Sequence, residues 1–192
     1  MVTSLPAIAA PFSLEHLLEG LSIGIRNCAL TISGDDYMET ENVWDYPRPP
    51  SLERVSDRLA VVFGGNTIAE TRAAFRVLET SHAPTYYLPR RDILADALIP
   101  NGRRTMCEWK GQAVYFDVVG HEKVATAAAW TYATPVPAFI AVAGFVAFYA
   151  EPMDACYVGD EKVMPQPGNF FGGWVTSNLI GPIKGGAGTM HW

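Results

Sequence analysis

The sequence predicts a mainly β domain: a compact β sandwich, or a barrel-like or tent-like sheet arrangement, with one short helix and an aromatic, glycine-rich C-terminal tail. Seven or eight short apolar or alternating segments are separated by turns rich in Gly, Asp and Pro. Amphipathic patterns of helical length are almost missing after residue 40. The chain has 192 residues, of which 49% are hydrophobic and 18% are charged, so we expect one domain with a sizeable core.

The chain divides into three parts. Residues 1–40 form an N-terminal extension, in which Ser13 is placed to cap a short helix and residues 23–32 suit a strand. Residues 41–164 form the β domain. Residues 165–192 form a tail that we expect to pack on the β domain, because disordered segments rarely contain so many large apolar side chains. These side chains include Phe170, Phe171, Trp174 and Trp192.

Turn residues place the strands of the β domain. Three prolines in residues 44–50 exclude a helix there. The segments 58–63 and 67–71 flank Gly64-Gly65-Asn66, which is typical of a hairpin. Further strands are expected at 75–79, 84–88, 112–119, 123–132, 145–149, 156–158 and 162–164. The short helix is expected at 91–98, where Ile93, Leu94, Ala97 and Leu98 share one side.

Charge and hydropathy argue against two classes of partner. The net charge is −6, and the only basic clusters are Arg90-Arg91 and Arg103-Arg104, so we expect no nucleic acid. Residues 124–150 contain no charged side chain and are long enough to span a bilayer. Pro135 and Pro137 interrupt this stretch, so we expect a buried strand, a proline turn, a short segment and a second strand rather than a membrane span.

The cysteines indicate a reducing, cytoplasmic setting. Cys28, Cys107 and Cys156 are odd in number and widely spaced, which fits neither a disulfide framework nor paired zinc ligands. No histidine pair has metal-ligand spacing, so we expect no metal and no cofactor. No basic residue precedes Arg26, so we expect no secretory signal.

The segment 107–111 places a thiol, a carboxylate, an indole and an amine on consecutive residues. If it is extended, Cys107 and Trp109 share one face, while Glu108 and Lys110 share the other. This pattern is compatible with a reactive pocket or with an ordinary core and a salt-bridged outer face. Cys107 would be a nucleophile if a neighbouring cation lowered its pKa, and it is otherwise a core residue.

A second cluster, at 79–87, supplies the candidate acid–base groups. His82 lies in a loop between expected strands, and we interpret His82, Lys110 and Glu79 as the catalytic candidates. The alternatives are a histidine bonded to loop backbone and an exposed ion pair. The residues expected to form an aromatic pocket, or else part of the core, are Tyr86, Tyr87, Trp109, Tyr115, Trp130 and Tyr132. We expect both clusters to line one cavity.

Several segments resemble the family called domain of unknown function 427. They are residues 44–50, 79–89, 107–115, 129–132, 148–157 and 166–192. The resemblance covers roughly residues 42–192 and implies a small, mostly β domain related in shape to methionine sulfoxide reductase B and cereblon-type folds. Such folds often hold zinc through two paired-cysteine knuckles, which this chain lacks. The family is sometimes labelled nucleotidyltransferase-like, but no phosphate-cradling loop with a carboxylate pair is present.

These observations predict a domain that binds a small molecule in an aromatic pocket. The first hypothesis is an enzyme that needs no cofactor and performs non-redox chemistry, of the isomerase, cyclase, lyase or hydrolase type. The alternatives are a non-catalytic module for a ligand or peptide and a structural or partner-binding domain. A homo-oligomer is compatible with the sequence.

Overall fold

Three antiparallel sheets make up the β domain. The computed structural model describes Met1, residues 39–168 and residues 170–192. The sheets have the strand orders β10-β9-β8-β7, β12-β11-β3-β4 and β2-β5-β6, and two short pairs, β1-β15 and β13-β14, accompany them. The strands are β1 Glu41–Asn42, β2 Ser51–Val55, β3 Leu59–Phe63, β4 Asn66–Thr71, β5 Ala74–Leu78, β6 Thr85–Tyr87, β7 Leu98–Cys107, β8 Gly111–Gly120, β9 Lys123–Thr131, β10 Val146–Phe148, β11 Ala155–Val158, β12 Glu161–Lys162, β13 Met164–Pro165, β14 Trp174–Val175 and β15 Leu179–Ile180.

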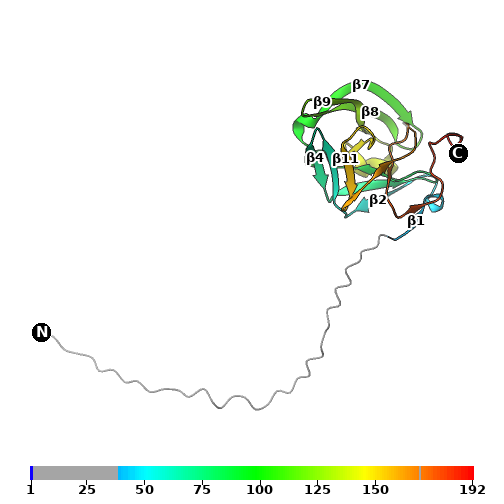
Figure 1. Cartoon of the computed structure of the whole chain (residues 1–192), viewed down its shortest axis with the longest axis horizontal. Coiled ribbons are helices and arrows are strands. Elements are labelled where there is room, and N and C mark those ends of the chain that lie inside the picture. Colours follow the sequence, from blue (N-terminus) through cyan, green and yellow to red (C-terminus); the bar gives the residue numbers. More distant parts are fainter. Residues whose placement is uncertain (2–38, 169) are drawn as a thin grey trace, which may run out of the picture. The chain divides into compact units, whose positions relative to one another are not determined.

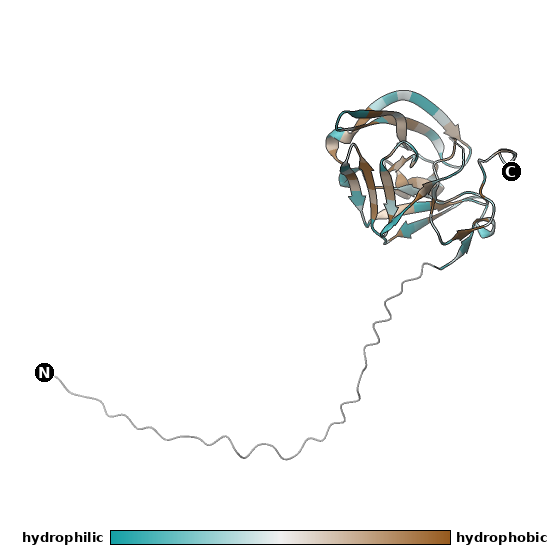
Figure 2. Cartoon of the chain, in the orientation of Figure 1, coloured by the Kyte–Doolittle hydropathy of each residue, from teal (hydrophilic) through white to brown (hydrophobic). Residues whose placement is uncertain are grey.

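The mainly β, sandwich-like fold is therefore confirmed. In Figure 1, β7, β8 and β9 form one curved layer in the upper part of the domain, and β4, β11 and β2 lie below it. Among the described residues no sheet closes into a barrel. A large apolar cluster from all three sheets fills the interior, including Leu59, Val118 and Phe148, which are fully buried. Figure 2 shows that the strands carry both hydrophobic and hydrophilic residues, as expected of sheets with one buried face.

The hairpin expected around residue 65 is present. Strands β3 and β4 pair with Phe63 opposite Asn66. Gly64 and Gly65 form the turn with φ values of 61° and 76°, a left-handed conformation that glycine adopts at little cost. The hairpins β8-β9 and β11-β12 are also as expected.

The prediction of a helix at 91–98 is wrong. Two short 3-10 helices, η2 (Arg90–Asp92) and η3 (Ala95–Ala97), replace it, and Ile93 between them is extended. Ile93 bridges to Ala69 of β4, and Leu94 is exposed, so tertiary pairing overrides the apolar periodicity. The longest helical element in the described chain is η4 (Pro137–Val142), which begins at a proline.

Bulges bend the β7-β8-β9 sheet. The register shifts between Asn101 and Arg104 and again between Phe116 and Val118. Asp117 accepts hydrogen bonds from the Asn101 side chain at 2.6 Å and from the Ala127 backbone at 2.7 Å. Ala127 has a φ of 50°, which is unusual for a residue other than glycine. Bulges increase local twist and curvature, so this sheet curves around one side of the interior.

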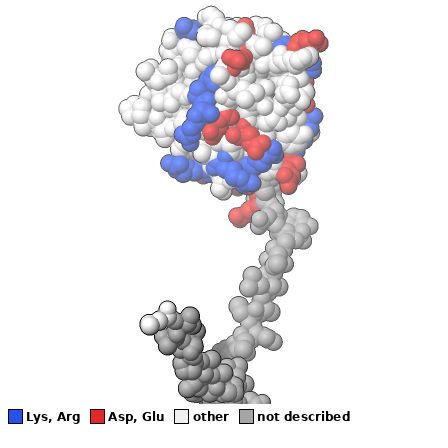
Figure 3. Space-filling model, turned by 90° about the vertical axis from the view of Figure 1, so that its left-hand side faces the viewer, with Lys and Arg blue, Asp and Glu red and all other residues white. Residues whose placement is uncertain are grey.

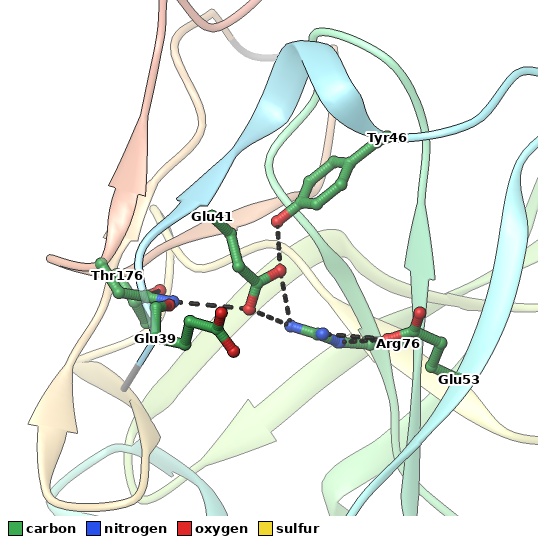
Figure 4. A network of polar contacts seen from close by, with 7 residues as sticks. Glu39, Glu41, Tyr46, Glu53, Arg76 and Thr176 are labelled. Carbon is green, nitrogen blue, oxygen red and sulfur yellow. Dashed lines mark hydrogen bonds and ion pairs between the residues drawn. The ribbon is translucent and has the colours of Figure 1, made fainter. Parts of the chain in front are cut away.

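An ion network fastens the first described segment to the sheet β2-β5-β6. Arg76 of β5 donates to Glu41 at 2.8 Å and to Glu53 of β2 at 2.9 Å, and the Tyr46 hydroxyl donates to Glu41 at 2.7 Å (Figure 4). Another 3-10 helix, η1 (Val43–Asp45), lies between Glu41 and Tyr46 and is capped by the side chain of Asn42. Residues 44–50 are therefore not wholly extended, although the prolines still prevent a longer helix.

The C-terminal tail packs on the β domain. Trp174 is fully buried, and its indole nitrogen donates to the Phe148 carbonyl at 2.9 Å. Trp192 is half-buried and contacts the Trp44 ring at 5.4 Å between centroids. These tryptophans cover apolar surface, as expected from the composition of the tail.

Residues 124–150 form β9, η4 and β10, as the proline positions indicate. No helix in the described part of the chain is long and apolar enough to cross a bilayer. Figure 3 shows basic and acidic side chains side by side on one face. The helix expected after Ser13, the strand expected at 23–32 and Cys28 lie outside the described residues.

Candidate functional site

The two clusters of candidate residues line one cavity. Its volume is about 280 Å³, close to the lower end of the usual range for small-molecule sites. The predicted residues on its wall are Glu79, His82, Tyr87, Trp109, Lys110, Tyr115, Trp130 and Tyr132. Strands β8 and β9, the loop after β5, the β7-β8 turn and the tail surround it. The convergence expected from the sequence is thus observed, while the roles of the residues stay predictions.

A tight turn after β5 positions His82. The His82 backbone N–H donates to the Glu79 carbonyl at 2.9 Å. Ser81, inside this turn, has a φ of 66° and is held from both sides: its N–H donates to the Val43 carbonyl and its carbonyl accepts from the Lys184 N–H. Such strain is tolerated where the surroundings fix the backbone. His82 therefore stands on a rigid loop.

The imidazole of His82 is prepared to accept a proton. Its Nδ1 lies 2.9 Å from the Thr80 carbonyl oxygen, which can only accept, so Nδ1 carries the hydrogen and Nε2 has the free lone pair. Phe171 packs edge-on against the ring at 4.7 Å between centroids. Burial lowers the pKa of His82 below its ordinary 6.5, which favours the neutral form near pH 7.

The segment 107–111 is a hairpin turn rather than an extended run. Cys107 of β7 pairs with Gly111 of β8, so Glu108, Trp109 and Lys110 form the loop between them. Gly111 has a φ of 95°, and a glycine at the end of a three-residue loop suits this geometry. The alternation of faces considered for an extended run therefore does not apply, because residues 108–110 form a turn. The cavity is lined instead by all four residues that precede Gly111 in this segment, from Cys107 to Lys110.

Lys110 is one of two buried lysines on the cavity wall, and Lys184 is the other. Lys110 is 7% exposed, and its Nζ lies 5.6 Å from the Phe139 ring centroid and 6.0 Å from that of Tyr132. None of the ion pairs within the described residues includes it. Aromatic faces attract a cation but do not neutralise it. Lys110 thus presents a positive charge for which this part of the protein supplies no carboxylate.

Glu79 is held by other protein groups. It accepts a hydrogen bond from the Trp109 indole at 3.3 Å and lies 3.8 Å from the Arg48 guanidinium. Arg48 also pairs with Glu108 at 3.3 Å. Glu79 lies on the cavity wall, but its known partners make it a weaker acid–base candidate than His82.

The aromatic residues form a continuous wall. The Tyr87 ring centroid is 6.3 Å from that of Tyr132 and 6.5 Å from that of Trp130, and Trp130 contacts Tyr149 at 4.6 Å. Burial raises the pKa values of Tyr87 and Tyr132 above the ordinary range, so both phenols stay protonated. They offer a ligand flat surfaces and hydroxyl groups.

Tyr86 does not belong to this wall. It is 4% exposed and packs against Trp174 in the main apolar core, 5.3 Å between ring centroids. Successive residues of a strand point to opposite faces, so only Tyr87 of this pair reaches the cavity. The structure therefore does not bring Tyr86 to this cavity. Tyr86 lines a separate hollow beside Arg76, and burial raises its pKa to about 12.

The cysteines fall into two environments. Cys107 is half-buried on the cavity wall, whereas Cys156 is 1% exposed in the core, where burial raises its pKa. Within the described residues, no group of three or more His, Cys, Asp or Glu side chains is arranged to hold a metal. The absence of bound zinc stays a prediction.

Several cavity residues were not predicted. They are mainly Arg48, Arg103, Thr105, Tyr149, Gln166, Phe170, Phe171 and Lys184. The tail provides four of them. Its sequence indicated that apolar side chains are buried, but not which part of the β domain they contact. Gln166 is held in place because its side-chain amide donates to the Lys184 carbonyl at 2.8 Å. The positions of the four tail residues depend on the path of the tail across the β domain, which the sequence does not specify.

Comparison with family models supplies the identification. Residues 51–159 match the model described as domain of unknown function (DUF427). The chain belongs to this family. A comparison with curated proteins found no match. The matched DUF427 segment contains Glu79, His82, Lys110 and the predicted aromatic residues, while Arg48, Gln166, Phe171 and Lys184 lie outside it.

Proposed function

We propose that this DUF427 domain binds a small organic molecule in the His82 cavity and catalyses a proton transfer on it without a cofactor. Isomerisation, cyclisation, elimination and hydrolysis all belong to this class. The observation that supports the proposal is the meeting of a neutral, oriented imidazole and a buried lysine on one aromatic-walled cavity.

In this mechanism His82 is the base. The bond from Nδ1 to Thr80 leaves Nε2 to take a proton from the ligand and later to return it. The positive charge of Lys110 stabilises negative charge that develops on the ligand, and burial strengthens this interaction. Tyr87 and Tyr132 supply the aromatic wall against which the ligand would lie.

A non-catalytic binding module is the second candidate. The bonds that Glu79 makes to Trp109 and Arg48 favour it, because they leave His82 without a free carboxylate as a second acid–base group. The aromatic wall alone would hold a flat ligand. A purely structural domain does not require such a cavity.

The test is a turnover screen. Purified protein is incubated with a mixture of small organic acids, amides, esters and ketones, and loss or isomerisation of each compound is followed by mass spectrometry and NMR. We expect at least one compound to be converted, and His82→Gln to slow that conversion roughly 10²- to 10⁴-fold. His121→Gln is the matched control, because His121 is exposed in the β8-β9 turn.

Two results would contradict the proposed catalysis by His82. One is conversion that persists at the wild-type rate in His82→Gln. The other is a compound that binds in the cavity but is left unchanged by the wild-type protein, which is the outcome expected of a binding module.

A further inference from the structure

The charge inside the cavity is opposite to that of the whole chain. Four cationic and two anionic side chains line the cavity, whereas the chain has a net charge of −6. Both anionic residues, Glu79 and Glu108, are paired with the same cation, Arg48. The other three cations are Arg103, Lys110 and Lys184, so positive charge predominates away from Arg48.

Two of these cations, Arg103 and Lys110, have no carboxylate partner among the described residues. Arg103 lies over the Tyr115 ring at 4.6 Å. Lys184 differs, because its Nζ donates to the main-chain oxygen of Trp192, the last residue of the sequence, and lies 5.4 Å from the Phe171 ring centroid. The Nζ of Lys110 lies beside the rings of Tyr132 and Phe139. A buried charge is costly unless a counter-charge meets it, so a negative group placed at Lys110 would be stabilised.

The aromatic part of the cavity wall indicates what kind of group the rest of the ligand contains. Tyr87, Trp130, Tyr132 and Tyr149 form the aromatic surface next to Lys110. Aromatic side chains favour flat, apolar groups, by stacking or by edge contacts. The volume of about 280 Å³ suits a small molecule of this kind.

We infer that the ligand of this cavity is a small aromatic or otherwise flat carboxylic acid, whose carboxylate lies against Lys110 and whose ring lies on the Tyr87–Trp130–Tyr132 wall. This inference rests on the proposed function only in using the same cavity, and it names the class of substrate. Arg103 adds to the positive field that attracts the acid.

Matched pairs of probes test the inference. Benzoate, phenylacetate, 2-naphthoate and indole-3-acetate are each compared with the corresponding amide, which keeps the ring and removes the charge. Dissociation constants are measured by ligand-observed NMR titration at low salt. We expect at least one acid to bind ten times more tightly than its amide, and this preference to decrease as salt is raised.

Substitution of Lys110 tests whether the preference for the acid over the amide depends on this residue. Lys110→Met keeps a long apolar side chain and removes the charge, so the acid should lose its advantage while the amide still binds. Lys123→Met is the control, because Lys123 is exposed, pairs with Asp154 at 2.9 Å and lies outside the cavity. The wild-type comparison of acid with amide needs no variant, so it remains decisive if Lys110→Met does not fold.

The inference is overturned if no acid binds more tightly than its amide, or if folded Lys110→Met keeps the preference. Acids that bind through Lys110 without being converted would support the inference and contradict the catalytic proposal. A neutral compound that is converted in a His82-dependent way would do the reverse.

Discussion

At the scale of single residues, the burial of His82 makes the stability of the protein depend on pH. Burial lowers its folded pKa below 6.5, whereas an unfolded histidine titrates near the ordinary value. Between the two pKa values the unfolded chain binds more protons, so the free energy of unfolding falls as pH is lowered from about 6.5 through the folded pKa.

We therefore expect His82→Gln to show a smaller loss of stability between pH 7.5 and pH 5 than the wild type. Urea unfolding at both pH values measures this difference, with His121→Gln as the control. An NMR titration in which the His82 imidazole protonates at or above pH 6.5 would contradict the burial argument.

Gly172 shows how closely the tail approaches the cavity. A Cβ atom added at this position would lie 2.0 Å from a ring atom of Trp130, so Trp130 would have to move. We expect Gly172→Ala to lower stability by about 1–3 kcal/mol and to weaken ligand binding. Urea unfolding checks the first effect, and Gly102→Ala is the control because its added Cβ meets nothing within 4 Å. Equal stability of the two variants would show that Trp130 adapts freely.

At the scale of elements, Arg76 fastens the segment around Glu41 to β2 and β5. The Arg76 and Glu41 side chains are 23% and 24% exposed, so water screens their ion pair only in part. We expect Arg76→Met to cost about 1–3 kcal/mol, and Lys123→Met, which breaks an exposed pair, to cost less than about 1 kcal/mol. A denaturant titration that gives both variants the same stability would mean that the network in Figure 4 contributes little.

The tail is the second element with a testable role. Deletion of residues 165–192 removes the fully buried Trp174 and should lower the melting temperature clearly. Trp174→Ala alone should cost about 3–5 kcal/mol, and Trp44→Ala, at a 43% exposed residue, should cost less. A melting curve that the deletion leaves unchanged would show that the tail is not part of the folded core.

Sequence reasoning succeeded for elements that local chemistry determines. Gly64-Gly65 specifies a hairpin turn, and Pro135 and Pro137 specify a break, whatever the rest of the chain does. It failed at 91–98, where the pairing of Ile93 with Ala69 decides the structure. It also missed β2 and β7, and it left the conformation of residues 107–111 open because three-residue loops have no strong local signature.

At the scale of the whole molecule, the sequence indicated the site because polar-tipped aromatic and titratable residues are concentrated in two segments. The sequence could not separate Tyr86 from Tyr87, since that depends on which face of β6 meets the cavity. Arg48, Arg103 and Lys184 could not be predicted for a similar reason. The loop before β2 brings Arg48 to the wall, the curved β7-β8-β9 sheet brings Arg103, and the path of the tail brings Lys184. The balance of charge in the cavity therefore emerges only from the fold.

The central claim is that this one cavity is the functional site, and the five tryptophans test it directly. Trp109 and Trp130 line the cavity, whereas Trp44, Trp174 and Trp192 do not. The measurement is a ¹⁵N-correlated NMR spectrum of the indole N–H groups, recorded while an aromatic acid that binds is added. The account predicts that the Trp109 and Trp130 signals shift with a common dissociation constant while the Trp44 and Trp174 signals stay in place. Shifts confined to Trp44, Trp174 or Trp192 would contradict it.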